Sequence, residues 1–441
     1  MCNFIAPIKL YRLLKFIAMK KIKLTLILLL ISCFSFSQTY ISGGIFSNTT
    51  WSPSGNPFIV TGNTVVFDGV DLTIDPGVVV KFDAGVGFEL RGKLIAIGNA
   101  TDSITFTSNL ASPTQSSWTG ITVIGTTNPL GVGDQITMEY CKGMYSHYFV
   151  DLNIAHHGPY IFRHCYFANN YKVNNDGGMP TTIFENCKFE SNHLALDWCQ
   201  FDSRVSNSFF INNVNGLEGI AHVDTCYFSG NTGIALSPYG STVGCTVVNN
   251  NIGVNCFFNG VNDTFINNTV INNSVGVEML SYINGSINFT GNTICNNTTY
   301  NVRLLHTNNA DLSNNCWCST DSAFIRSTIY DGYVNISYGL VNFMPLAGSC
   351  PQIGVGFDTP ATSNVLSTSI FPNPFNNKIE IKNENNKVSE VILFDITARK
   401  MLQQKFTNSV SLNTEQLAKG IYVYEVRCGS SLCKKGKLVK N

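Results

Sequence analysis

The chain has 441 residues, enough for two or three domains, and its formal net charge of zero hides three unequal segments. Residues 1–37 carry six basic and no acidic side chains, residues 38–365 carry 10 basic and 22 acidic ones, and the remainder carries twelve basic and six acidic ones. A central segment this acidic repels phosphate, which makes nucleic acid a poor candidate partner.

The N-terminal segment has the pattern of a signal peptide. A basic stretch over residues 19–23 precedes an apolar run over residues 24–31 that is too short to span a bilayer. Small residues precede a cleavage point after residue 37. We interpret residues 1–37 as a signal peptide whose true start is Met19. Cys33 also fits a lipoprotein cleavage box, so lipid attachment is the alternative to plain secretion.

Residues 40–125 alternate apolar and polar side chains in short runs separated by turn residues, which predicts strands throughout. The expected strands are 64–67, 72–74, 78–82, 88–91, 94–97, 104–107 and 121–124. The stretch Leu72-Thr73-Ile74-Asp75-Pro76-Gly77-Val78-Val79-Val80-Lys81-Phe82, with Trp118-Thr119-Gly120-Ile121, resembles the opening coils of secreted right-handed parallel β-helices of the pectin-lyase-like type. This resemblance implies a fold and carries no catalytic residue.

One short pattern recurs seven times between Cys165 and Val302. Clear copies are Asn186-Cys187-Lys188-Phe189-Glu190-Ser191-Asn192 and Asn207-Ser208-Phe209-Phe210-Ile211-Asn212-Asn213. The closing asparagines are spaced 18–24 residues apart, at Asn170, Asn192, Asn213, Asn231, Asn250, Asn273 and Asn297. Units with such short apolar–polar alternation cannot bury a face alone and must stack on their neighbours. The repeat therefore predicts a parallel β-solenoid.

Three columns of this repeat have a physical interpretation. Asparagine tolerates the left-handed backbone of a sharp corner, and its amide can hydrogen-bond to the amides of coils stacked about 4.8 Å above and below. A second column is expected to point inward: Phe167, Phe189, Phe210, Phe228, Val247, Val270 and Ile294. A third column places a cysteine two positions before four of these, at Cys165, Cys187, Cys226 and Cys245. We interpret the cysteines as small buried hydrophobic residues. Disulfides between coils are the alternative.

The end of the repeat region looks like the closing motif of the same β-helices. The motif consists of Asn314-Asn315-Cys316-Trp317-Cys318 and Val341-Asn342-Phe343-Met344-Pro345-Leu346. Cys318 stands where glycine is more usual, and a disulfide from Cys316 or Cys318 to Cys350 is the expected replacement. The sequence between residues 165 and 350 predicts no amphipathic helix.

The tail beyond residue 368 has a different pattern, after a linker over residues 353–368. Four short motifs define this pattern: Pro372-Asn373-Pro374, Leu393-Phe394-Asp395, Gly420-Ile421-Tyr422-Val423 and Gly436-Lys437-Leu438-Val439-Lys440. They resemble the C-terminal sorting domain of type IX secretion in Gram-negative bacteria, although Ala398 replaces a usual glycine. The resemblance implies a small Ig-like β-sandwich over residues 369–441 that the type IX secretion machinery recognises as a sorting signal. It therefore also implies that the protein is secreted or lies on the outer cell surface. The sorting motif carried over comprises Pro372, Asn373, Pro374, Asp395, Gly420, Tyr422 and Lys437.

The predicted fold class is therefore all-β, with a right-handed parallel β-helix over residues 38–352 followed by the small β-sandwich. An outward column on the β-helix is the candidate site. Asp197 and Glu218 occupy equivalent positions on successive coils, and Asn255 and Glu278 lie further along. Such carboxylates can hold Ca²⁺ as a cofactor or act as an acid and base pair. The alternative is a solvated column of tolerated charges.

Aromatic residues beside this column suggest a sugar-stacking strip, with core or corner packing as the alternative. The strip comprises Trp198, Tyr239, Phe257, Phe258 and Tyr282. The seven histidines show no metal-ligand spacing, so no metal site is predicted from them.

The predicted role is that of an adhesin or glycan-binding surface protein. A polysaccharide lyase or glycoside hydrolase with Asp197 and Glu218 as its catalytic residues is the alternative, and a purely structural stalk is a third interpretation. Galacturonan hydrolases of this fold carry paired-Asp, Gly-His-Gly and Arg-Ile-Lys signatures, and none of these is present in the sequence.

Overall fold

The computed structural model describes residues 38–124, 135–152, 159–175, 181–198, 202–257, 263–281, 287–348, 368–371, 375–383, 388–395, 399–428 and 431–440. The chain divides into two compact units, Met1–Pro351 and Gln352–Asn441. The signal peptide and all but the last residue of the linker that the sequence predicts lie outside the described residues.

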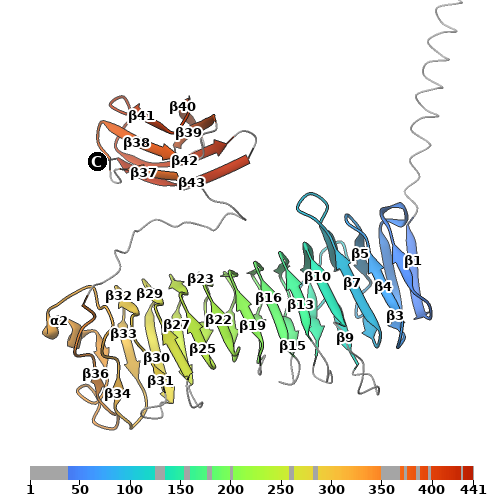
Figure 1. The fold of residues 1–441 in the computed structure, drawn as a ribbon, viewed down its shortest axis with the longest axis horizontal. Helices are drawn as coiled ribbons and strands as arrows, with labels where there is room; N and C mark the ends of the chain where they lie inside the picture. The colour runs from blue at the N-terminus through green and yellow to red at the C-terminus, as the bar shows by residue number, and fades with distance from the viewer. Residues whose placement is uncertain are drawn as a thin grey trace, which may run out of the picture. The chain divides into compact units, whose positions relative to one another are not determined.

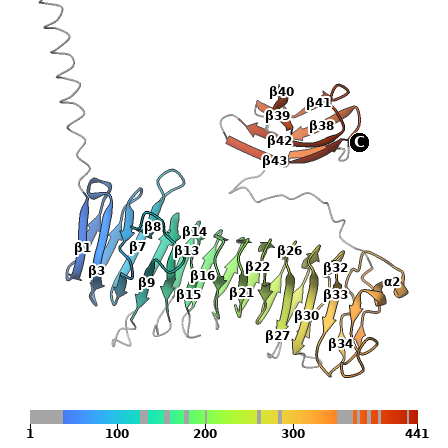
Figure 2. The same cartoon turned by 180° about the vertical axis from the view of Figure 1, so that it is seen from behind.

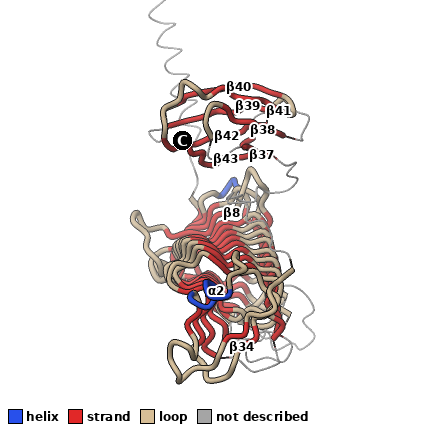
Figure 3. The backbone as a smooth tube through the Cα atoms, turned by 90° about the vertical axis from the view of Figure 1, so that its left-hand side faces the viewer, coloured by secondary structure: helices blue, strands red, loops and turns tan. Residues whose placement is uncertain are grey.

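The first unit is a parallel β-solenoid whose coils each contribute one strand to each of three faces (Figure 1, Figure 2). Each strand pairs in parallel with the strand three places further along the chain, as β16 does with β19, β17 with β20 and β18 with β21. Seen end-on, the strands of successive coils lie behind one another (Figure 3). This arrangement confirms the solenoid that the repeat predicts.

The strands of the three faces follow one another in regular order. The first face contains β2 (Thr49–Trp51), β4 (Asp71–Ile74), β7 (Lys93–Ile97), β10 (Ile136–Glu139), β13 (Tyr160–Arg163), β16 (Thr182–Glu185), β19 (Arg204–Ser206), β22 (His222–Asp224), β25 (Ser241–Val243), β28 (Asp263–Ile266) and β31 (Ile287–Asn288). The second face contains β5 (Val79–Phe82), β8 (Ile104–Ser108), β11 (Cys141–Met144), β14 (Tyr166–Ala168), β17 (Lys188–Glu190), β20 (Phe209–Ile211), β23 (Tyr227–Ser229), β26 (Thr246–Val248), β29 (Thr269–Ile271) and β32 (Thr293–Cys295). The third face contains β6 (Gly87–Leu90), β9 (Trp118–Val123), β12 (Ser146–Asp151), β15 (Lys172–Asn175), β18 (Leu194–Leu196), β21 (Asn215–Glu218), β24 (Ile234–Ser237), β27 (Ile252–Phe257), β30 (Val275–Ser281), β33 (Tyr300–Leu304) and β35 (Ile329–Tyr330).

The second and third faces join near the first described residues. There β3 (Phe58–Val66) pairs with β1 (Thr39–Ile45) on one side and with both β5 and β6 on the other. A 3-10 turn over Pro53–Gly55 lies between β2 and β3. A long strand that spans two faces thus replaces the corner that separates them in later coils.

The inward column is confirmed. Its seven residues are in register from strand to strand, and all are fully buried. Phe189, Phe210 and Phe228 stack with ring centroids 4.7 and 4.5 Å apart. Burying one such side chain stabilises the fold by about 1.5–3 kcal/mol. The aromatic stack therefore contributes to the burial that holds successive coils together.

The closing asparagines form a continuous hydrogen-bonded file, the asparagine ladder: Asn170, Asn192, Asn213, Asn231, Asn250, Asn273 and Asn297. Each Nδ2 donates to the Oδ1 of the next asparagine at 2.8–3.2 Å. Each backbone N–H donates to that same Oδ1 at 2.9–3.0 Å. The ladder begins at Ser146, which donates twice to Asn170, and ends at Asn301, which accepts from Asn297. The predicted amide stacking is confirmed.

The sequence predicts left-handed backbone at the ladder asparagines themselves, but it lies one residue earlier in each coil. Positive φ angles of 55–71° belong to the residues that precede the ladder: Asn169, Ser191, Asn212, Gly230, Asn249, Asn272 and Asn296. The ladder residues are instead positioned to send their amides into the core. Local backbone preference and stacking are thus divided between two adjacent positions.

The cysteine column consists of buried free thiols, as interpreted from the sequence. Cys165, Cys187, Cys226 and Cys245 are unbonded, and Cys141 extends the column by one coil. Each thiol donates to nearby backbone carbonyls, as Cys187 Sγ does to Phe162 O at 3.4 Å. Burial raises the pKa of Cys187 well above its ordinary value, so its thiol stays protonated and unreactive in the folded state.

The solenoid ends in an irregular cap built on β34 (Ala310–Asp311), β36 (Val341–Asn342) and the short helix α2 (Ser322–Ser327). The expectation of no helix in this region is wrong. Asp321 caps α2 by accepting from Ala323 N at 2.9 Å, and the helix buries only Ile325. A helix of under two turns with one buried residue leaves no periodic pattern in the sequence.

Disulfides fasten the last coils. Cys295 is bonded to Cys318, which ties the end of β32 to the cap. Cys318 therefore has Cys295 as its partner rather than Cys350, and the alternative tie from Cys316 to Cys350 stays a prediction. Cys316 is also disulfide-bonded, and Cys350 lies outside the described residues.

The second unit consists of two antiparallel sheets. One contains β37 (Thr368–Phe371), β38 (Lys378–Asn383) and β41 (Ser409–Asn413), and the other contains β39 (Ser389–Asp395), β40 (Lys400–Phe406), β42 (Gly420–Cys428) and β43 (Ser431–Lys440). Side chains of both sheets form one buried cluster, including Ile379, Leu412, Leu393 and Val426. Two sheets around a common core form a small β-sandwich.

The asparagine ladder predicts a large loss of stability when one of its members is removed. Asn250→Ala takes away the acceptor of Asn231 N and Nδ2 and the donor to Phe228 O. We expect the free energy of unfolding to fall by about 3 kcal/mol, because each orphaned buried polar group costs about 1–3 kcal/mol. Urea unfolding followed by circular dichroism measures it. Asn251→Ala is the matched control, since Asn251 is exposed. Equal effects of the two substitutions would contradict a structural role for the ladder.

Candidate functional site

The third face carries a continuous polar file. We define this polar file as Asp197, Glu218, Ser237, Asn255, Glu278 and Arg303. Glu218 pairs with Ser237, Asn255 with Glu278, and Glu278 with Arg303 in the strand register. Asp197 directly follows Leu196, whose partner Leu217 precedes Glu218. The four polar residues that the sequence predicts for the site therefore lie in one file.

Asp197 is held at the start of the file by contacts from the preceding coil. Lys172 Nζ forms an ion pair with Asp197 Oδ2. Asn174 accepts a hydrogen bond from Asp197 N at 2.8 Å and donates one to Asp197 O at 2.7 Å. Burial disfavours the charged ammonium of Lys172, but the contact with Asp197 outweighs it, so the pKa of Lys172 is raised. Lys172 is therefore a fixed cation next to this carboxylate.

Glu278 is similarly neutralised at the other end of the file. Arg303 Nη2 forms an ion pair with Glu278 Oε1, and Asn255 Nδ2 donates to Glu278 Oε2 at 3.1 Å. Only 6% of Glu278 is exposed. A carboxylate buried to this extent is tolerated because a cation and an amide both contact it. These contacts favour a structural role for Glu278 over direct contact with a ligand.

Glu218 has weaker support than the other two carboxylates. Asn215 Nδ2 donates to Glu218 Oε1 at 3.4 Å, and the structure gives Glu218 no ion pair among the described residues. Partial burial and the neighbouring charge of Asp197 raise the pKa of Glu218, and the charge of Lys172 lowers it less. Glu218 is therefore the carboxylate of the polar file with the most unused capacity for a partner.

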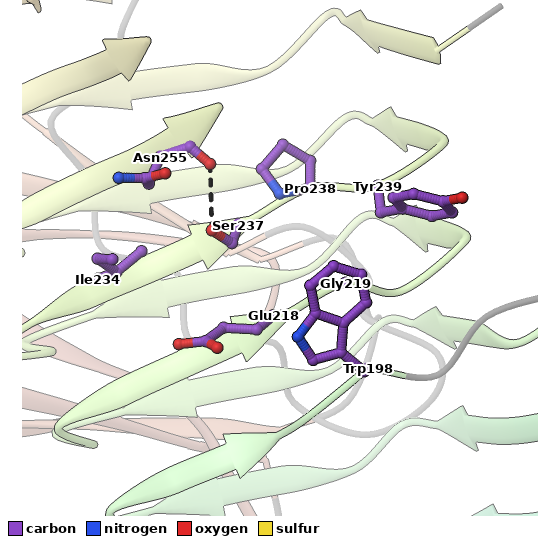
Figure 4. Close-up of a pocket in the computed structure, with 8 residues that line it drawn as sticks. All are labelled: Trp198, Glu218, Gly219, Ile234, Ser237, Pro238, Tyr239 and Asn255. Carbon is purple, nitrogen blue, oxygen red and sulfur yellow. Dashed lines mark hydrogen bonds between the residues drawn. The ribbon is translucent and has the colours of Figure 1, made fainter. Parts of the chain in front are cut away.

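A pocket of about 280 Å³ opens beside Glu218. Its lining residues come from four successive coils: Trp198, Glu218, Gly219, Ile234, Ser237, Pro238, Tyr239 and Asn255. Figure 4 shows the rings of Trp198, Pro238 and Tyr239 on one side and the polar ends of Glu218 and Asn255 on the other. The Trp198 and Tyr239 ring centroids are 6.1 Å apart with a tilt of 56°. The pocket therefore combines an aromatic wall with hydrogen-bonding groups.

The structure brings together four of the six predicted ligand-binding residues. Trp198, Glu218, Tyr239 and Asn255 line the pocket, whereas Asp197 and Glu278 lie in the same file without lining it. Of the other aromatics named for the strip, the side chain of Phe257 and residues 258 and 282 lie outside what the structure describes.

Several contributors to the site were not predicted from the sequence. Gly219, Ser237 and Pro238 line the pocket, and Lys172 and Arg303 neutralise two carboxylates of the polar file. The repeat could have identified Ser237, because Ser237 has the same position in its coil as Glu218. It could not have identified Lys172 and Arg303, since their partners are 25 residues away along the chain.

No three His, Cys, Asp or Glu side chains of the described residues lie close enough together to hold a metal ion. Within the same residues, no helix is long and apolar enough to cross a membrane.

The sorting-motif residues that the structure describes lie on the second unit. Asp395 ends β39 and accepts from Arg399 N and Nε, both at 3.0 Å. Gly420 begins β42, and Tyr422 OH donates to Ala418 O at 2.7 Å. Lys437 pairs with Val423 along β43. Residues 372–374 and Ala398 lie outside the described residues.

Comparison with known proteins identifies the second unit. Residues 369–441 match the family described as "Secretion system C-terminal sorting domain". No curated protein matches the chain. Among solved structures, the crystal structure of the Acinetobacter phage vB_ApiP_P1 tailspike protein aligns with 86% of this chain and 72% of its own, at 8% identity and a TM-score of 0.24. A superposition this weak carries no argument about function, and the solenoid rests on its strand registers. Residues 369–441 are thus a type IX secretion C-terminal sorting domain, which directs the chain to the cell surface or the extracellular space.

Proposed function

We propose that the solenoid is a glycan-binding protein of the cell surface or extracellular space, and that the pocket beside Glu218 is its binding site. The observation that carries this proposal is the combination of Trp198 and Tyr239 with Glu218 and Asn255 around one pocket. Sugar rings have apolar C–H faces that pack on aromatic rings and hydroxyl groups that need hydrogen-bond partners. Secretion by the sorting domain brings such a pocket to where extracellular polysaccharides are found.

The exposure of Trp198 supports the same proposal. Trp198 is 41% exposed, whereas the other three tryptophans of the chain are buried. Its backbone has a φ of 24°, a conformation that L-residues rarely adopt. Residues held in strained backbone conformations cluster at functional sites, so the backbone of Trp198 supports a binding position.

The raised pKa of Glu218 favours an enzyme as the second candidate. A carboxyl group that keeps its proton closer to neutral pH suits a general acid, and Asp197 on the preceding coil suits a nucleophile or base. The ion pair between Asp197 and Lys172 argues against this alternative, because it occupies one of the two carboxylates.

Trp198→Ala tests the binding site. We expect affinity for a glycan, identified by screening the secreted protein against neutral and acidic polysaccharides, to fall about tenfold or more, which corresponds to about 1.4 kcal/mol. Isothermal titration calorimetry, with and without a calcium chelator, measures it. Tyr40→Ala removes an aromatic elsewhere on the solenoid that is more exposed than Trp198, and it should leave the affinity unchanged. Unchanged binding by the Trp198 variant would exclude this pocket.

Gly219 leaves room for the indole of Trp198. An added Cβ at Gly219 would lie 2.9 Å from Trp198 Cδ2 and Cε3. We expect Gly219→Ala to displace the ring, to increase iodide quenching of the tryptophan fluorescence and to weaken glycan binding. Gly69→Ala is the matched control, because Gly69 has a similar φ of +75° but open space around it. Equal quenching in the two variants would mean that the ring does not depend on this contact.

Turnover separates the binder from the enzyme. If the solenoid is a binder, incubation with the glycans it retains yields neither new reducing ends nor unsaturated products. Cleavage that is lost in both Asp197→Ala and Glu218→Gln would instead establish the second candidate.

A further inference from the structure

The three carboxylates of the polar file differ in how their charge is compensated. Asp197 has Lys172 and Glu278 has Arg303, each as an ion-pair partner. Glu218, which lines the pocket, has only the amide of Asn215 at 3.4 Å among the described residues. Among the described residues, the carboxylate of the polar file without an ion pair is therefore the one that lines the pocket.

The walls of the pocket are suited to a cation. Trp198 and Tyr239 present aromatic rings, whose faces attract a positive charge by about 0.5–2 kcal/mol according to how well it is desolvated. The net negative charge of the segment that contains the pocket adds to this attraction, because residues 38–365 carry 22 acidic and 10 basic side chains. A ligand with a positive charge would thus be attracted at long range and held by the rings and by Glu218 at short range.

A neutral ligand and a divalent metal ion fit the site less well. A neutral sugar would desolvate Glu218 further without a charge to compensate it, which is unfavourable for a carboxylate. Ca²⁺ takes six to eight oxygen ligands, whereas the pocket offers one carboxylate and the oxygens of Ser237 and Asn255. An organic ammonium needs one carboxylate and an aromatic wall.

We propose that the pocket recognises a protonated amine carried on a sugar, so that the ligand is a glycan containing amino sugars with free amino groups. This rests on the proposed function and names its ligand class. The ammonium donates a charge-assisted hydrogen bond to Glu218, while the sugar ring packs on Trp198. Ser237 Oγ donates to Asn255 O, and Asn255 Nδ2 donates to Glu278 Oε2, so these two side chains offer their oxygens as acceptors for the sugar hydroxyl groups.

Protonation of Glu218 gives the site a distinct pH dependence. The charged or titratable groups that face Glu218 are Asp197, Lys172 and, in the pocket wall, Tyr239. Burial and Asp197 raise the pKa of Glu218 above its ordinary value of 4.5. Because binding requires the carboxylate, affinity for the amine falls as pH drops through this raised pKa. Asp197→Asn removes the repulsion and moves this acid limb to lower pH.

The experiment compares glucosamine oligomers with N-acetylglucosamine oligomers of equal length by isothermal titration calorimetry on the secreted protein. At neutral pH we expect the free amine to bind about tenfold more tightly or more, since charge-assisted hydrogen bonds are roughly twice as strong as neutral ones. Glu218→Gln should bring this ratio close to one and abolish the acid limb, while binding of the acetylated oligomer persists and shows that the variant is folded. Glu185→Gln is the control, because Glu185 pairs with Arg163 on the first face.

Each other outcome has a definite meaning. Equal affinity for the two oligomers, or a ratio that survives Glu218→Gln, overturns the inference. Choline binding as tightly as the glucosamine oligomer would make the ligand a simple ammonium and overturn the sugar component. Binding of other glycans without any preference for the aminated oligomer refutes this inference but leaves the proposed function standing. Failure to bind any glycan refutes both.

Discussion

The structure depends on one hydrogen-bonding arrangement, in which each coil satisfies the buried polar groups of the coil before it. A primary amide donates and accepts at the same time, so one asparagine per coil can continue a file without leaving an unpaired group. The asparagine ladder runs in this way from Ser146 to Asn301, and both of its ends are closed by polar side chains. Because an unsatisfied buried amide is costly, any slip of one coil against the next is penalised at every step.

This fixed register is also what assembles the pocket. Its lining residues come from four coils, and they meet only because equivalent positions on the third face are aligned. The same alignment stacks Asp197 above Glu218, which is unfavourable for two carboxylates and which Lys172 relieves only in part. The regularity that stabilises the solenoid therefore also creates the electrostatic imbalance at the candidate site.

The sequence predicts much of this fold, because a repeat makes each buried position visible several times. The closing asparagines, the inward aromatics and the cysteine column are all found at the expected places. Prediction from the sequence fails where a feature is not repeated from coil to coil. The helix α2 occurs once and buries a single residue. The left-handed corner residues are Asn, Ser or Gly in different coils, whereas the next position is asparagine in every coil of the ladder. The sequence therefore points to the regular asparagine as the corner residue, although the corner lies one residue earlier.

The candidate site is predicted less completely for a related reason. Glu218, Asn255 and Trp198 stand out because their residue types are unusual beside an apolar strand. Gly219 and Pro238 act through shape alone, and residues of that kind occur at many turns. Lys172 and Arg303 can be identified as the ion-pair partners of Asp197 and Glu278 only when the strand register is known exactly.

A stack of coils loses order most readily from its ends, where a coil has a neighbour on one side only. The two ends of this solenoid are not equivalent. The bond between Cys295 and Cys318 staples the final coils together, whereas no cysteine occurs between residues 38 and 140. We therefore expect fraying to start in the first coils and to reach the pocket, which lies on the coils of β18 to β27, only later. A protein clipped or partly unfolded in its first coils outside the cell is therefore expected to keep the coils that form the pocket.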